Sequence, residues 1–180
     1  MGTLFIDKKE RKTSAHRLQG LALILSAICL LIGQFGNGSA FFRVISLIGS
    51  VLFLLGIPAV YAVQSMGSIE LIGIILIELA AVITLGFQSR ILSRTELGNT
   101  LILASAIAMM IGNALIGWIT TQNNVFPAWV GWTFLADGLL NFIGGVFDVG
   151  SIAYGLAFVV LLLGVIARFG YGFFLYQRQE

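Results

Sequence analysis

Five polar side chains lie inside long runs of apolar residues, and they are the groups that could do chemistry or tie helices together. They are Glu78, Asn113, Asp137, Asn141 and Arg168. An ionised carboxylate surrounded by lipid costs about 3 kcal/mol on insertion scales, so we expect Glu78 or Asp137 to pair with Arg168. One arginine cannot neutralise two acids, so a second acid would remain for a proton relay or an ion site. A purely structural network would have the same composition.

The depth of these residues in their apolar runs suggests that four of them share one layer. Glu78 lies seven residues from the predicted inner end of its run, Asn113 and Arg168 eight, and Asp137 nine. At 1.5 Å per helical residue, these positions are about 10 to 14 Å from the inner boundary. Depth does not decide which helices are neighbours, so the acid that pairs with Arg168 stays open.

The fifth apolar run carries a polar stripe. Thr133, Asp137 and Asn141 recur every four residues, so they share one face of a helix. Such a stripe either packs against neighbouring helices or lines a wet cavity.

Several kinds of site are absent from the sequence. The only histidine, His16, precedes the first apolar run, and the only cysteine, Cys29, lies inside it. Neither an intramembrane haem held by two histidines nor a Cys/His zinc site can therefore form. We expect no catalytic residue, no metal, no cofactor and no enzyme activity. A second basic patch is also missing, so we expect no nucleic-acid partner.

The composition predicts an integral membrane protein. Of the 180 residues, 58% are hydrophobic and 10% are charged, whereas soluble domains have about 25% charged residues. Six apolar segments are each long enough to cross a bilayer: 18–36, 41–64, 71–88, 101–121, 128–147 and 151–176. They lack the period-two alternation of barrel strands. The predicted fold class is therefore an all-α polytopic bundle of about six transmembrane helices, with one domain at 18–176 and tails at 1–17 and 177–180.

Basic residues predict the orientation of the bundle. Five of them crowd the first tail: Lys8, Lys9, Arg11, Lys12 and Arg17. Such a cluster favours the cytoplasmic side and binds anionic lipid heads. Six spans then place both termini in the cytoplasm, in agreement with Arg178. Arg90 and Arg94 oppose this orientation, so the side of the loop at 89–100 stays open.

Two segments carry a resemblance to known proteins. RLQGLALILSAICLLIG (17–33) and FPAWVGWTFLADGLL (126–140) resemble segments of small six-span bacterial membrane proteins of unknown function. In that group a Pro-x-Trp-x-Gly-Trp signature opens a late span, and Pro127, Trp129, Gly131 and Trp132 match it. The resemblance implies a six-helix architecture and a bacterial plasma membrane. It transfers no activity and no catalytic residue.

Three functional hypotheses follow from these observations. The first is a non-catalytic membrane component, a small accessory, assembly or scaffold protein held by helix packing. Beside the lipid bilayer, the partners left open are another membrane protein or a second copy of the chain. The second is a small proton- or ion-coupled transporter that uses Glu78, Asp137 and Arg168, which requires a water-accessible cavity touching both acids. The third is a membrane enzyme acting on a lipid.

Overall fold

A computed structural model describes residues 2–34, 39–64, 67–89, 96–146 and 152–178, and these residues form six α-helices without a strand. The helices are α1 (Gly2–Gln34), α2 (Ala40–Gln64), α3 (Ser68–Gln88), α4 (Glu96–Gln122), α5 (Ala128–Val146) and α6 (Ile152–Gln177). The predicted all-helical class is confirmed for the described residues.

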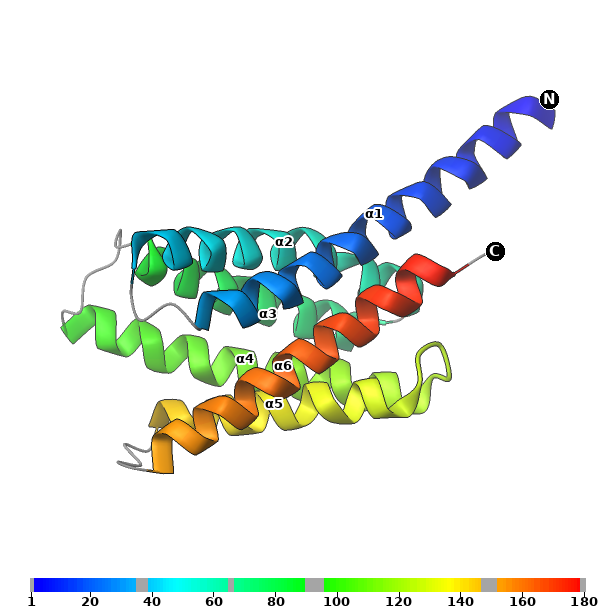
Figure 1. Cartoon of the computed structure of the whole chain (residues 1–180). Helices are drawn as coiled ribbons and strands as arrows, with labels where there is room; N and C mark the ends of the chain where they lie inside the picture. The colour runs from blue at the N-terminus through cyan, green and yellow to red at the C-terminus, as the bar shows by residue number, and fades with distance from the viewer. Residues whose placement is uncertain (1, 35–38, 65–66, 90–95, 147–151, 179–180) are drawn as a thin grey trace.

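The helices form a closed ring in chain order. Each helix packs against the next one along the chain, and α1 closes the ring against α6. A smaller contact joins α2 to α6 across the ring. The first turn of α1 and the last turn of α6 point to the same end of the bundle, and α1 extends beyond its neighbours (Figure 1). The predicted tail 1–17 therefore continues the first helix from Gly2 onward.

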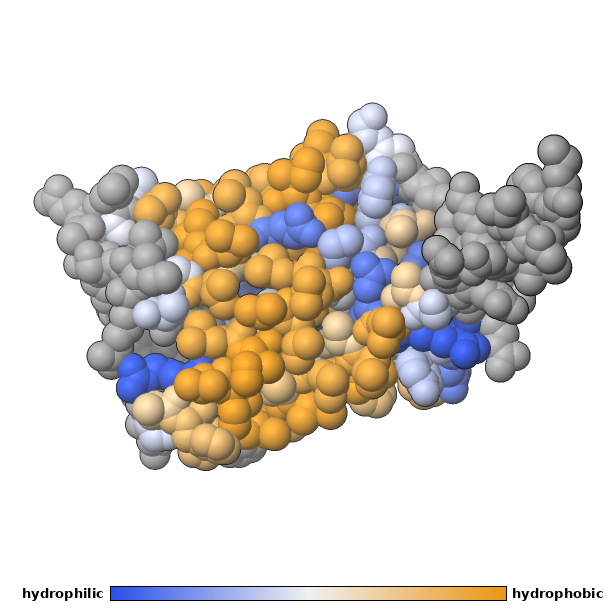
Figure 2. All heavy atoms as spheres, turned by 90° about the horizontal axis from the view of Figure 1, so that it is seen from above, coloured by the Kyte–Doolittle hydropathy of each residue, from blue (hydrophilic) through white to orange (hydrophobic). Residues whose placement is uncertain are grey.

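The outer surface of the bundle is apolar. Among the residues that the structure describes, five helical segments are long and apolar enough to cross a membrane: 14–33, 40–64, 68–87, 100–122 and 158–177. Helix α5 has 19 residues, which gives a length of about 28 Å, close to the 30 Å hydrocarbon layer. Figure 2 shows a broad hydrophobic band over the middle of the molecule, with hydrophilic residues gathered mainly toward the two ends. This surface suits lipid rather than water.

Glycines allow two pairs of helices to approach closely. A methyl group added to Gly131 of α5 would lie 2.5 Å from the carbonyl oxygen of Gly117 in α4. A methyl group added to Gly172 of α6 would lie 2.6 Å from the carbonyl oxygen of Gly20 in α1. Small residues at such contacts are the usual way in which membrane helices gain packing energy. These contacts fix how α5 and α6, which carry the polar residues, meet their neighbours.

A short connection sets the start of α5. Asn124 has a φ of 54°, a left-handed conformation that asparagine tolerates better than most residues. Pro127 directly precedes the helix, as expected of a residue that lacks an N–H, and its carbonyl accepts a hydrogen bond from Val130 N at 3.0 Å.

Candidate functional site

Asp137 is the centre of a hydrogen-bonded cluster inside the bundle. Its side chain is 8% exposed, and each carboxylate oxygen accepts one amide hydrogen bond. Asn113 Nδ2 of α4 donates to Oδ2 at 3.2 Å, and Asn141 Nδ2 donates to Oδ1 at 2.9 Å. Asn141 Nδ2 also lies 2.9 Å from the main-chain oxygen of Asp137, one turn earlier on α5. The polar stripe of α5 therefore connects to α4 through Asn113.

A glycine of α6 provides the space for this carboxylate. A methyl group added to Gly164 would lie 3.2 Å from Asp137 Oδ1, so the acid rests against the bare backbone of α6. Arg168 follows Gly164 by four residues and thus shares its helix face. Asp137 therefore faces α6 one turn before Arg168, and this geometry favours Asp137 over Glu78 as the acid near Arg168.

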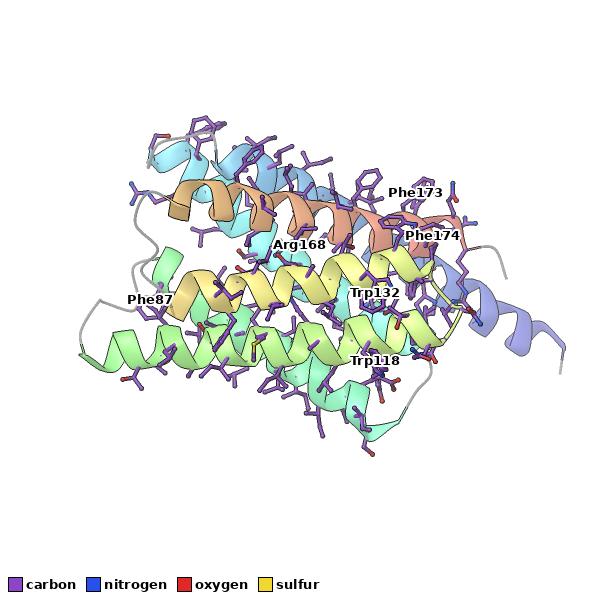
Figure 3. The ribbon with its side chains drawn as sticks, turned by 90° about the horizontal axis from the view of Figure 1, so that it is seen from below. Phe87, Trp118, Trp132, Arg168, Phe173 and Phe174 are labelled. Atoms are coloured by element: carbon purple, nitrogen blue, oxygen red, sulfur yellow. The ribbon has the colours of Figure 1, made fainter. Side chains whose placement is uncertain are left out.

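Arg168 also joins two further helices. Its Nη1 donates to Ser26 Oγ of α1 at 3.1 Å, and its guanidinium lies 4.2 Å from the ring centroid of Phe53 of α2. Such a cation–π contact stabilises a positive charge to which water has little access. The side chain is half-buried and lies about midway along the bundle (Figure 3). One arginine therefore contacts α1 and α2 and acts on the acid of α5.

Glu78 lies at a similar level but in different surroundings. A methyl group added to Gly112 would lie 2.6 Å from Ile77 Cγ1, so Gly112 and Ile77 lie at the same level of the bundle. Their successors in the chain, Asn113 and Glu78, therefore lie at similar levels too. However, α3 packs against α2 and α4, while Asp137 and Arg168 lie on α5 and α6. Glu78 is half-buried and forms no hydrogen bond or ion pair with the described residues. The structure joins Asn113, Asp137 and Asn141 by hydrogen bonds, sets Asp137 against α6 one turn before Arg168, and leaves Glu78 outside this cluster.

A second buried cluster was not singled out from the sequence. Gln64 Nε2 donates to Thr120 Oγ1 at 2.6 Å, and Thr120 Oγ1 lies 2.7 Å from the hydroxyl of Tyr171. All three side chains are at most 1% exposed, and they join α2, α4 and α6. Thr120 follows Asn113 by seven residues and Tyr171 follows Arg168 by three. Residues three or seven apart lie on the same face of a helix, so Thr120 and Tyr171 share the faces of Asn113 and Arg168. This shared face is the sequence signal that could have revealed the cluster.

Three buried oxygens near these clusters have no hydrogen-bond partner among the described residues: Asn113 Oδ1, Gln64 Oε1 and Glu70 Oε2. Glu70 is 4% exposed although it lies in the first turn of α3. Within the described part of the chain, no group of three or more His, Cys, Asp or Glu side chains could hold a metal ion. The arrangement can therefore tie helices together and accept further hydrogen bonds.

The fold and the buried polar clusters define a helical membrane protein with polar ties between its helices. Comparison with family models, with curated proteins and with solved structures gave no match.

Proposed function

We propose that this protein is a non-catalytic component of a plasma membrane, an accessory or scaffold subunit that crosses the bilayer six times with both termini in the cytoplasm. The supporting observation is the use of its buried polar groups. Both carboxylate oxygens of Asp137 accept amide hydrogens from its own bundle, and Arg168 donates to Ser26. These groups hold helices in place.

The outside of the bundle fits the same proposal. Each of the six helices exposes large apolar side chains, among them Leu55 at 60% and Phe158 at 55%. Such a surface contacts lipid tails or the helices of other membrane proteins. The first tail, whose sequence carries the basic cluster, belongs to the part of α1 that extends beyond the bundle, and a basic sequence beside a membrane span favours binding to anionic lipid heads.

The native size of the protein tests this proposal. A tagged copy expressed at its natural level is extracted from its own membrane in a mild detergent and sized by native chromatography with mass measurement. We expect an assembly far heavier than one 19.4 kDa chain plus its detergent, with a second protein present at a fixed ratio. A chain that runs as a monomer or as a homo-oligomer would contradict the proposal.

A small proton- or ion-coupled transporter is the second candidate. The half-buried Arg168 beside Asp137 and the unpartnered Asn113 Oδ1 favour it, because a water or an ion could complete this cluster. The purified protein in vesicles containing a pH-sensitive dye distinguishes the two candidates. A proton flux that Asp137→Asn abolishes would support the transporter. If vesicles with and without the protein show the same flux, the Asp137 cluster does not by itself carry protons across the membrane.

A further inference from the structure

Glu78 lies on the border between the buried and the lipid-facing sides of α3. One turn before it, Ile74 is 4% exposed, and one turn after it, Val82 is 53% exposed. Residues four apart on a helix are neighbours, so the carboxylate lies between the core of the bundle and its outer surface. An acid at the middle of a membrane helix is costly without a partner.

The bundle supplies no such partner within the part of the chain that the structure describes. Glu78 makes no hydrogen bond or ion pair there, and Arg168 donates to Ser26 and lies over Phe53 instead. A donor from another molecule could therefore satisfy this carboxylate.

The residues around Glu78 have the spacing of a helix–helix seam. Leu71, Ile75, Glu78 and Val82 follow one another at intervals of four, three and four residues, and we call them the α3 seam. Its three apolar members are exposed by 44%, 52% and 53%. A repeat of three and four residues is the pattern by which two helices pack side by side. β-Branched residues and leucine in alternate positions favour a pair of helices over larger bundles. A single polar residue in such a seam specifies the partner and the register.

We propose that the α3 seam docks a transmembrane helix of another protein, which carries a lysine or arginine at the depth of Glu78. Charge complementarity selects this occupant. A second copy of the chain in a two-fold arrangement would place one Glu78 against another, and two carboxylates at one site repel each other. The docking deepens the proposed function and rests on it, because it assigns the partner contact of the accessory subunit to one helix face.

A synthetic helix tests the recognition directly. The probe is a leucine- and alanine-rich transmembrane peptide with one central lysine, labelled for energy transfer to the full-length protein in phosphatidylcholine vesicles. The same peptide with a central leucine is its control. We expect the lysine peptide to bind about threefold to tenfold more tightly than the leucine peptide, the range of single interhelical hydrogen bonds in membranes. In Glu78→Gln this preference should disappear.

Glu70→Gln is the matched control variant, because it makes the same chemical change on the buried face at the end of the same helix. It should keep the preference for the lysine peptide. Thermal melting of both variants in detergent verifies that they are folded.

Three results with the purified protein and the peptides would overturn the docking site. They are equal binding of both peptides by the wild-type protein, an unchanged preference in Glu78→Gln, and self-association that Glu78→Gln removes while the lysine peptide does not compete. Purification of the native assembly distinguishes a failure of the docking site from a failure of the proposed function. If Glu78→Gln leaves the co-purified partner at its normal ratio, the subunit proposal stands and the docking site on α3 falls.

Discussion

Asp137 and Glu78 are carboxylates at similar depth with opposite surroundings. Asp137 is 8% exposed and accepts hydrogen bonds from Asn113 and Asn141, whereas Glu78 is half-buried at the edge of α3. A buried charge is tolerated when hydrogen bonds and an opposite charge compensate for the lost water. Asp137 has the hydrogen bonds, and it rests against Gly164, one turn before Arg168 on α6. The two acids therefore have different surroundings, one inside the bundle and one at its edge.

Replacement of Asp137 tests its role as an internal tie. In Asp137→Asn the side chain loses one acceptor, opposes the amides of Asn113 and Asn141, and leaves Arg168 without its counter-charge. We expect the free energy of unfolding to fall by about 3 kcal/mol, as when one partner of a buried ion pair is removed. Denaturant titration in mixed micelles measures it. Asp137→Asn combined with Arg168→Gln should lose less than the sum of the single variants, and strict additivity would contradict the coupling.

Tyr171 offers a smaller and cleaner test. Tyr171→Phe keeps the ring, which packs edge-on against Phe126 and Phe134, and removes only the hydroxyl that meets Thr120. The stability should fall by about 1 kcal/mol, the net value of one hydrogen bond. Tyr176→Phe is the matched control because Tyr176 is 51% exposed, and it should leave the melting temperature unchanged. Equal effects of both variants would show that the buried hydroxyl contributes no stability.

The positions of the helices along the chain could be predicted from the sequence, whereas the contacts between helices could not. The thickness of a bilayer fixes the length of an apolar run, so the predicted segment 41–64 closely matches α2 at Ala40–Gln64. Contacts depend on which faces meet, and no run length encodes that. Asp137 rests against α6 because Gly164 leaves space between α5 and α6, a detail of packing. Glu78 lies at a similar level to Asn113 but outside the Asp137 cluster, because α3 contacts α2 and α4.

The close contact between α4 and α5 can be tested at the scale of these two helices. Gly131→Ala would place its methyl group 2.5 Å from the oxygen of Gly117, so the helices must move apart. Overpacking of this kind costs about 1 to 3 kcal/mol, more than the gain in helix propensity from alanine. We expect a lower melting temperature in detergent. Gly67→Ala, where an added methyl meets nothing within 4 Å, should melt like the wild type, and a stable Gly131→Ala would contradict the packing.

The whole molecule has two unlike ends. Trp118 and Trp132 are exposed by 55% and 54%, and they lie toward the same end of the bundle as Phe173 and Phe174 (Figure 3). Aromatic side chains prefer the boundary between lipid and water. Phe87 lies toward the opposite end. Trp118 and Trp132 lie toward the end at which α1 begins and α6 finishes, so we expect the basic tail and these tryptophans to lie at the same membrane surface.

Accessibility of single cysteines tests the number of crossings for the whole chain. Cys29 is first replaced by serine, and Arg17, Asn124 or Arg178 is then changed to cysteine and treated with a membrane-impermeant maleimide in right-side-out and inverted vesicles. Because six crossings place all three positions on the cytoplasmic side, we expect labelling only in inverted vesicles. If α5 failed to cross, Arg178→Cys would instead be labelled in right-side-out vesicles while Asn124→Cys would not. Labelling of Arg17→Cys from outside would reverse the orientation that the basic tail predicts.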